Sequence, residues 1–320
     1  MMKVLANDGI SKAGADRLKE AGITLFDQRV SPEHLINFIN ENKVDVLLVR
    51  SATKVKKELI DACKSLKIIG RGGVGMDNID VDYAREKGLI LINTPTASTR
   101  SVAEIVFAHF LSLARHLHEA NRLMPLEGDT KFDQLKRSFA NAYELQGKAL
   151  GVIGFGNIGK EVAKIGIAMG MKVKVFTRTS RQETIELNFF DGQKLSFNIQ
   201  TTNNWDEFLS DTEFLSINTP KTNGYLIDEE QLQKMKHGVY IVNTARGGVI
   251  NEKALMNFIE EGKVAGAALD VFENEPHPEI QVLMNPALSL TPHLGGSTID
   301  AQEKIGIELA NQIIDIKTKL

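Results

Sequence analysis

A glycine-rich turn, set between a short apolar run and a stretch with helical periodicity, constrains this chain more than any other feature. Residues 149–153 are apolar and predict a buried strand, while apolar side chains at helical spacing over residues 158–169 predict a helix. Gly154, Gly156 and Gly159 lie between them in the spacing Gly-x-Gly-x-x-Gly. In this context the first glycine makes a tight turn, the second lets backbone approach a pyrophosphate, and the third packs helix against strand. The pattern predicts a dinucleotide site, and the alternative is a purely structural turn.

The start of the predicted helix is also suited to phosphate. The first N–H groups of a helix have no intrahelical partner and carry a partial positive charge, which favours an anion. Asn157 and Ile158 lie at this position. We therefore expect them to bind the cofactor together with the three glycines.

Length and composition narrow the class of protein. A chain of 320 residues exceeds one ordinary domain and suggests two, and 42% hydrophobic residues suffice for real cores. A net charge of −3 with interspersed signs indicates neither a nucleic-acid partner nor a membrane surface. Cys63 is the single cysteine, which favours a reducing compartment, and no signal-like segment follows the N-terminus. We expect a cytoplasmic protein.

Short apolar runs alternate with helical stretches along most of the chain, which predicts parallel α/β sheets. In the first part the predicted strands are residues 4–7, 44–49, 67–69 and 89–92. The strands predicted from the glycine turn onward are residues 149–153, 173–176, 214–217, 239–242, 265–269 and 288–290. This second series predicts a doubly wound Rossmann sheet with its binding crevice at the carboxyl ends of the strands.

Two long predicted helices define the domain organisation. Residues 98–117 form the first, in which Ser101 and Glu104 have the spacing of a capping box, and residues 298–316 form the second. The C-terminal segment that contains the second helix is too short to form a domain. We expect it to pack on the first part of the chain. The prediction is a smaller domain of residues 1–97 and 293–320. A dinucleotide-binding domain of residues 98–292 is inserted into it.

One segment interrupts the alternation of strands and helices. Residues 184–190 and 194–199 alternate polar and apolar side chains on either side of Asp191-Gly192, a pair typical of hairpin turns. The hairpin could be a surface decoration. It could also be a flap over the adenosine end of the cofactor or a contact between subunits.

The chain resembles the D-isomer-specific 2-hydroxyacid dehydrogenases over essentially its whole length. The segments that carry the resemblance are residues 49–53, 70–79, 93–95, 243–248, 268–276 and 291–298. Within the family it is most similar to the short-form D-3-phosphoglycerate dehydrogenases, which lack a regulatory tail. The resemblance implies that the smaller domain is a flavodoxin-like substrate domain. It also implies oxidation of 3-phospho-D-glycerate to 3-phosphohydroxypyruvate, the first step of L-serine biosynthesis. The alternative is the glyoxylate and hydroxypyruvate reductase branch.

The resemblance assigns the catalytic roles to Arg246, Glu275 and His293. A histidine suits the removal of a hydroxyl proton because its pKa lies near the working pH. A neighbouring carboxylate favours the imidazolium, and an arginine binds a substrate carboxylate in bidentate fashion. The alternatives are a surface arginine, a turn histidine and a solvated acidic loop. The resemblance further assigns nicotinamide-side contacts to Thr219, Pro220, Ala245 and Asp270. We also expect Thr244, Gly295 and Gly296 to bind the cofactor.

The substrate contacts implied by the resemblance lie in the first part of the chain. They are Arg50, Ser51, Arg71, Gly73 and Ser98, with the two arginines meeting the phosphate or the carboxylate. In the family a segment that includes Lys136 and Arg137 crosses to a partner subunit, so these residues could add cations or could be solvated charges. Ser98 stands where the family usually has an asparagine, which leaves the contact at this position open.

The cofactor preference is open as well. An NAD site requires an acidic residue at the end of the second strand, about 20 residues beyond the glycines. Thr177 and Arg178 stand there instead, and Arg181 follows. A hydroxyl and two arginines would suit the 2′-phosphate of NADP. Alternatively, Arg178 stacks on the adenine and NAD binds.

The overall expectation is an NAD(P)-dependent dehydrogenase of a small 2-hydroxy acid, acting as a homodimer or homotetramer without a metal. A metal motif is missing from the sequence, because it contains no HExxH and no cysteine pair. A remote alternative is a non-catalytic protein on the same scaffold that senses the dinucleotide. Such a sensor needs the glycine turn but has no use for Arg246, Glu275 and His293 together.

Overall fold

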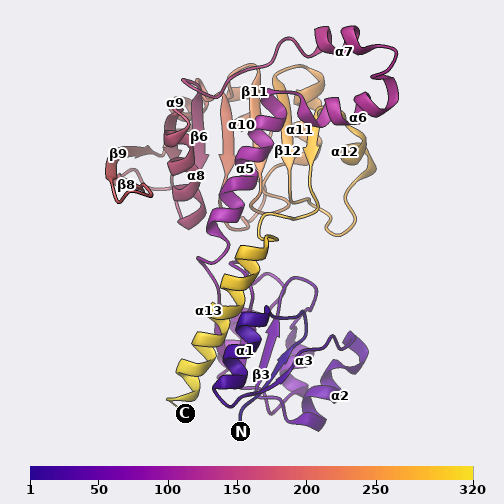
Figure 1. Ribbon diagram of the computed structural model, residues 1–320, viewed down its shortest axis with the longest axis vertical. Coiled ribbons are helices and arrows are strands. Elements are labelled where there is room, and N and C mark those ends of the chain that lie inside the picture. The colour runs from indigo at the N-terminus through magenta and orange to yellow at the C-terminus, as the bar shows by residue number, and fades with distance from the viewer. Residues whose placement is uncertain (320) are drawn as a thin grey trace. The chain divides into compact units, whose positions relative to one another are not determined.

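The computed structural model describes residues 1–319, which form two compact units. Unit 1 consists of Met1–Ser101 together with the chain from Gly296 onward, and unit 2 is Val102–Gly295. Each unit is built around its own sheet (Figure 1). No described helix has both the length and the apolar character needed to cross a membrane.

Unit 1 contains a five-stranded parallel sheet in the order β2-β1-β3-β4-β5. Its strands are β1 (Lys3–Ala6), β2 (Thr24–Phe26), β3 (Val46–Val49), β4 (Ile68–Arg71) and β5 (Ile90–Asn93). Its helices are α1 (Lys12–Glu20), α2 (Pro32–Asn42), α3 (Lys57–Ala62), α4 (Val81–Glu86) and α13 (Ile299–Lys317). This strand order is the flavodoxin-like order, as predicted. The short strand β2 was not predicted.

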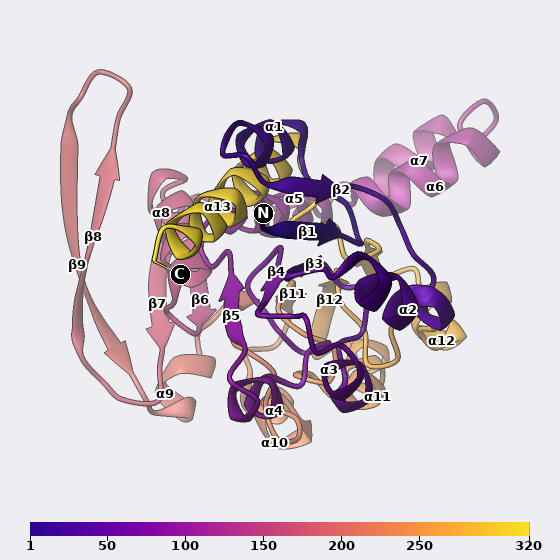
Figure 2. The ribbon, with the colours of Figure 1, turned by 90° about the horizontal axis from the view of Figure 1, so that it is seen from below.

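Helices α1 and α13 lie side by side on one face of this sheet (Figure 2). The contact depends on two glycines: a Cβ atom on Gly14 would lie 2.5 Å from the carbonyl oxygen of Gly306. Ile305, Leu309 and Ile313 of α13 are buried with residues of β1 and β3. The C-terminal helix thus packs on the first part of the chain.

Unit 2 contains an eight-stranded sheet in the order β13-β12-β11-β10-β6-β7-β9-β8. All neighbours are parallel except β8 and β9. The strands are β6 (Ala149–Ile153), β7 (Lys172–Phe176), β8 (Gln182–Asn188), β9 (Lys194–Thr202), β10 (Phe214–Ile217), β11 (Val239–Asn243), β12 (Val264–Leu269) and β13 (Leu288–Leu290). The helices are α5 (Thr99–Ala114), α6 (Leu117–Glu127), α7 (Phe132–Ser138), α8 (Asn157–Ala168), α9 (Trp205–Leu209), α10 (Glu229–Lys234), α11 (Glu252–Glu260) and α12 (Ile280–Met284). The predicted doubly wound Rossmann sheet is confirmed.

The two boundaries between the units lie a few residues later than the sequence suggested, after Ser101 and after Gly295. The first shift arises because the buried face of α5 begins at Val102 and Ala103. The second arises because the backbone N–H groups of Leu294 and Gly295 donate to Asp270 of unit 2. His293 consequently belongs to unit 2, although we expected the substrate domain to begin there.

The predicted helix over residues 98–117 is present as α5, with different ends. Helix α5 begins at Thr99, so Ser101 is no N-cap; its hydroxyl lies 2.6 Å from that of Thr298. The helix ends at Ala114 because His116 adopts a left-handed conformation with φ 53°.

Helices α6 and α7 follow as an arm over residues 117–138. None of the residues of α6 is buried, and α7 buries only Leu135. Helices without a buried apolar stripe leave no clear periodicity in the sequence, and the arm was accordingly not predicted.

The hairpin is confirmed as strands β8 and β9, joined around Asp191 and Gly192. Ile185 and Ile199 near its base are buried in the core that also holds α8. Phe189 and Phe190 at its tip are exposed. Figures 1 and 2 show the hairpin and the α6–α7 arm at opposite ends of the unit 2 sheet.

Candidate active site

The glycine turn has the geometry that close backbone packing requires. Gly154 adopts φ +85°, and a Cβ atom on it would lie 2.6 Å from the carbonyl oxygen of Asn218. A Cβ atom on Gly159 would lie 2.0 Å from the carbonyl oxygen of Gly154. Gly156, the N-cap of α8, has nothing within 4 Å of its Cβ position. The turn is therefore tight on the protein side and open where a phosphate would approach, and Asn157 and Ile158 begin α8 beside it.

The carboxyl ends of β10 and β11 carry buried polar atoms that have no partner. They are Oδ1 of Asn218, Oγ1 of Thr219 and Oγ1 of Thr244, which find no hydrogen bond within the described chain. Unpaired buried polar atoms are costly, so their clustering indicates groups prepared for a ligand. They lie next to the exposed Pro220 and the buried Ala245. The residues present therefore fit a dinucleotide along the carboxyl edge of this sheet.

The carboxyl end of β7 is the place where the adenosine ribose of a dinucleotide lies in this fold. The Thr177 hydroxyl is used internally, since it lies 2.9 Å from both the carbonyl oxygen of Thr179 and the hydroxyl of Thr201. Arg178 is exposed and makes no hydrogen bond or ion pair with any described residue. No carboxylate occupies the end of the strand itself.

His293 and Glu275 form a pair within unit 2. His293 Nδ1 lies 3.0 Å from Oε2 of Glu275, while Oε1 of Glu275 accepts the backbone N–H of Phe272 at 2.9 Å. Burial opposes ionisation of Glu275, but its hydrogen bonds from His293 and Phe272 and the charges of His293 and Arg246 hold its pKa below the ordinary value. The pair adjoins a pocket of about 370 Å³ that is lined mainly by apolar residues. The imidazole is thus oriented by an ionised carboxylate, with its other nitrogen left for chemistry.

Arg246 follows β11 in a loop that is held by Asn243. The Asn243 side chain donates to the carbonyl oxygen of Arg246 at 3.0 Å and accepts the N–H of Ala245, also at 3.0 Å. Arg246 is close enough to Glu275 to act on its pKa. The three residues assigned to catalysis are therefore brought together in unit 2.

Asp270 organises the loop that carries His293. Its side chain is 1% exposed and accepts three hydrogen bonds: from the Thr291 hydroxyl at 2.6 Å, and from the N–H groups of Leu294 at 2.6 Å and Gly295 at 2.8 Å. Buried His109 contacts the same Thr291 hydroxyl through Nε2 at 3.1 Å. A nicotinamide contact by Asp270 remains a prediction, because in this structure both of its oxygens hold the loop.

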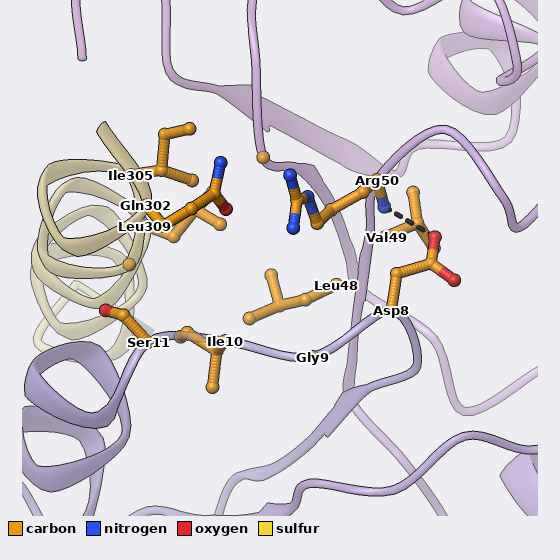
Figure 3. A pocket seen from close by; sticks show the side chains of 12 residues that line it. Asp8, Gly9, Ile10, Ser11, Leu48, Val49, Arg50, Gln302, Ile305 and Leu309 are labelled. Atoms are coloured by element: carbon orange, nitrogen blue, oxygen red, sulfur yellow. Dashed lines mark hydrogen bonds between the residues drawn. The ribbon is translucent and has the colours of Figure 1, made fainter. Parts of the chain in front are cut away.

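Arg50 lines a pocket of about 240 Å³ at the carboxyl ends of β1, β3 and β4 in unit 1. Figure 3 shows its guanidinium pointing toward Gln302 of α13. Asp8 holds the backbone in place, since its Oδ2 accepts the N–H of Arg50 at 2.7 Å and that of Thr53 at 3.0 Å. The guanidinium itself makes no hydrogen bond or ion pair with any described residue of its unit.

The other expected substrate residues also lie in unit 1. Gly73 adopts φ +137°, and the position of its missing Cβ lies 2.1 Å from Nη1 of Arg71, so the arginine folds over the glycine. The Gly73 N–H donates to the Thr94 hydroxyl at 2.8 Å. Ser98 is buried beside Gly296, whose Cβ position lies 3.5 Å from that of the serine. Ser51 is exposed next to Arg50.

A reciprocal contact between Glu252 and Glu273 was not predicted. The Glu252 carboxylate accepts the N–H of Glu273 at 2.7 Å, and the Glu273 carboxylate accepts the N–H of Glu252 at 2.8 Å. This joins the start of α11, just beyond Arg246, to the loop that carries Glu275. Glu252 is buried, which raises its pKa to about 7. No local pattern could reveal the contact, because the two glutamates are far apart in the sequence.

Three residues assigned to catalysis, a dinucleotide fold and a pocket lined by Arg50 are thus present in one chain. The family model for the NAD binding domain of D-isomer specific 2-hydroxyacid dehydrogenases matches residues 107–295. The chain belongs to the D-isomer specific 2-hydroxyacid dehydrogenase family. The expected family, the fold and a nicotinamide-dependent oxidoreductase activity are thereby confirmed.

Two relatives show how far the similarity extends among these dehydrogenases. The hydroxypyruvate reductase of Thermotoga maritima is 40% identical over 319 residues, which cover 97% of each chain. The D-3-phosphoglycerate dehydrogenase of Bacillus subtilis is 39% identical over 320 residues, covering 98% of this chain and 57% of the relative. The chain thus spans just over half of the phosphoglycerate dehydrogenase but nearly all of the reductase.

A solved relative of this dehydrogenase shows the same fold. The D-lactate dehydrogenase of Aquifex aeolicus, in complex with NAD and lactic acid, is 27% identical and superposes with a TM-score of 0.78. The match covers 100% of this chain and 96% of that one. Within residues 1–319, no group of three His, Cys, Asp or Glu side chains is arranged to hold a metal ion.

Proposed function

We propose that this dehydrogenase oxidises 3-phospho-D-glycerate to 3-phosphohydroxypyruvate with NAD or NADP, as the first step of L-serine biosynthesis. The observation that carries the proposal is Arg50, a cation in a pocket of unit 1 without a carboxylate partner in that unit. A phosphorylated acid carries more negative charge than a plain 2-hydroxy acid and therefore requires more cations. Arg71, one strand along in the same sheet, supplies a second.

His293 is the proton carrier in this proposal. During oxidation it accepts the hydroxyl proton of the substrate, and during reduction it returns a proton to the oxygen of the 2-oxo acid. Glu275 orients the ring through Nδ1 and stabilises the positive charge that the ring gains on accepting the proton. Arg246 binds the substrate carboxylate and polarises the adjacent carbonyl group.

The dinucleotide would be held by the glycine turn, the start of α8 and the unpaired side-chain oxygens of Asn218, Thr219 and Thr244. When bound, it accepts the hydride released from the carbon that carries the hydroxyl group. The N–H groups at the start of α8 would bind the pyrophosphate. Pro220 and Ala245 would line the nicotinamide side of the site.

Replacing Arg50 tests the choice of substrate. Arg50→Gln keeps a hydrogen-bond donor but shortens the side chain and removes the charge. We expect it to lower kcat/KM for 3-phosphohydroxypyruvate by about tenfold or more, the equivalent of about 1.4 kcal/mol, and to change kcat/KM for hydroxypyruvate much less. Equal losses for both acids would contradict a phosphate role for Arg50.

A second candidate is the reduction of hydroxypyruvate or glyoxylate. It is favoured by the reductase from Thermotoga maritima, which this chain matches over 97% of its length. In that case Arg50 and Arg71 would be structural or would bind the carboxylate of a smaller acid. A higher kcat/KM for hydroxypyruvate than for its phosphorylated form would select this candidate.

The α6–α7 arm supports a homodimeric or homotetrameric assembly. Its apolar side chains Leu117, Met124, Leu126 and Phe132 are exposed. Exposed apolar side chains concentrated on a projecting segment are typical of an interaction surface. We propose that the arm packs on a second copy of the chain, which would also bring the exposed Lys136 and Arg137 to the partner.

A further inference from the structure

Three charged side chains meet between the first turn of α8 and the base of the β8–β9 hairpin. Lys160 Nζ lies 3.0 Å from Oε2 of Glu183, and Arg181 Nε lies 2.6 Å from Oε1 of the same carboxylate. The Glu183 side chain is 17% exposed. A single carboxylate therefore engages two cations, one from the cofactor helix and one from the turn after β7.

These residues lie at the adenosine end of the expected cofactor site. Lys160 directly follows Gly159, the last glycine of the turn. Arg181 ends the segment that begins with Thr177 and Arg178, where a dinucleotide fold binds the adenosine ribose. Lys160 also lies over the ring of Phe155, with its Nζ 5.6 Å from the centroid, within the glycine turn itself.

The position of Glu183 relative to this segment is fixed by buried Thr201 of β9. Thr201 accepts the N–H of Arg181 through its hydroxyl at 2.9 Å, and its own N–H donates to the carbonyl oxygen of Arg181 at 2.9 Å. Its hydroxyl also contacts that of Thr177. Because Glu183 lies opposite Ile199 in the same hairpin, the hairpin delivers a carboxylate to a defined place beside the cofactor turn.

We propose that Glu183 determines the choice of dinucleotide. By binding Arg181 and Lys160 it withholds two of three nearby cations from a ribose 2′-phosphate and leaves only Arg178 for it, so that the enzyme prefers NAD over NADP. The carboxylate that the end of β7 lacks is thus supplied from the hairpin, where it acts as a counter-ion to the arginine. The inference rests on the proposed dinucleotide site and adds its selectivity.

Calorimetric binding to the full-length chain tests the proposal without turnover. The probes are adenosine 5′-monophosphate and adenosine 2′,5′-bisphosphate, which differ only in the 2′-phosphate. Glu183→Gln is expected to tighten the bisphosphate by about tenfold relative to the monophosphate, since it releases Arg181 and Lys160. Glu186→Gln on the same strand is the matched control, because exposed Glu186 makes no ion pair with any described residue. It is expected to leave the ratio of affinities unchanged.

A variant of Arg181 distinguishes the release of this arginine from Glu183 from a general change in the charge of the surface. Arg181→Gln is expected to lower bisphosphate affinity strongly in the Glu183→Gln background and only slightly in the parent. An unchanged affinity ratio in Glu183→Gln, or an equal change in Glu186→Gln, would overturn the proposal. Failure of the parent to bind either nucleotide or NADH would instead contradict the dinucleotide site itself. A melting temperature equal to that of the parent shows for each variant that the base of the hairpin is still folded.

Discussion

His293 Nδ1 and Glu275 Oε2 are 3.0 Å apart, and the other oxygen of the same carboxylate is held by the backbone N–H of Phe272. The ring is therefore oriented by a carboxylate that is itself fixed to the backbone. His293 has a positive φ of 55°, a conformation that is uncommon outside glycine. Such backbone is tolerated where the surroundings determine it, as the hydrogen bonds to Asp270 do here.

Removal of the imidazole should abolish most of the turnover. For His293→Ala we expect kcat to fall by about 10²- to 10⁴-fold, the usual contribution of a positioned acid or base. Glu275→Gln keeps the shape of the side chain and should lose less. Steady-state assays measure both, with NADH binding by fluorescence as the control for an intact cofactor site. A His293→Ala variant that keeps more than about a tenth of kcat would refute this role.

Asp270 should matter for both stability and turnover. Asp270→Asn places an amide group against backbone N–H groups in a buried site, so that donors face one another. We expect a loss of about 1–3 kcal/mol in the free energy of unfolding and a lower kcat, because the loop of His293 loosens. Asp129→Asn, at an exposed position in the arm, is the control and should be neutral. Urea unfolding measures the free energy of unfolding, and steady-state kinetics measure kcat. An Asp270→Asn variant equal to the parent in either quantity would contradict the corresponding expectation.

Two glycines of the turn should respond differently to alanine. A Cβ atom on Gly159 would lie 2.0 Å from a carbonyl oxygen, whereas one on Gly156 meets no protein atom within 4 Å. Gly159→Ala is therefore expected to lower the melting temperature. Gly156→Ala should keep it but weaken NADH binding, because the methyl group enters the space left for the pyrophosphate. If Gly156→Ala bound NADH as tightly as the parent, the dinucleotide would lie elsewhere.

Glu252 should make stability depend on pH. Burial raises its pKa to about 7, whereas an ordinary glutamate has a pKa of 4.5. Between these values the folded protein retains a proton that the unfolded chain has released, so the contribution of Glu252 to the free energy of unfolding falls as the pH rises, by up to about 3 kcal/mol. Glu252→Gln retains an oxygen that can accept the Glu273 N–H but carries no charge.

Urea unfolding at pH 5 and pH 8 tests this directly. The free energy of unfolding of Glu252→Gln, minus that of the parent, should become more positive as the pH rises from the first value to the second. A difference that stays constant across the range would show that Glu252 keeps its ordinary pKa in the folded protein.

The α6–α7 arm should control assembly. Leu126 is 76% exposed, so a charged side chain there should not disturb the folded monomer. We expect Leu126→Glu to lower the mass measured by light scattering toward that of one chain. An unchanged mass, with an unchanged melting temperature, would assign the interface between copies to another surface.

The parts of the fold that are predictable from the sequence are those with a strong local pattern. The strand 149–153 and the glycine turn were placed correctly, because a fully buried parallel strand is continuously apolar and the turn requires particular glycines. Strand β2, which is only three half-buried residues long, has too little pattern to stand out. The α6–α7 arm has no buried face from which a periodicity could arise.

The residues that carry the chemistry of the site were predictable from the sequence. The residues that hold them in place were not. Arg246, Glu275 and His293 stand in recognisable motifs. Asp8, which holds the backbone of Arg50, is 42 residues away from it in the sequence, and only the parallel pairing of β1 with β3 brings the two together. Glu183 likewise gains its partners through the hairpin register and its packing near α8.

The proposed substrate and cofactor are tested most directly by the reduction of NAD and of NADP by the purified protein with D-3-phosphoglycerate, D-glycerate and glycolate. We expect turnover of the phosphorylated acid above the other two, with NAD as the better acceptor and with loss of turnover in His293→Ala. Preferred turnover of D-glycerate or glycolate would contradict the phosphate role of Arg50 and Arg71 and place the enzyme among the reductases. Turnover of none of these acids, by a protein that still binds NADH, would contradict the proposed substrate class.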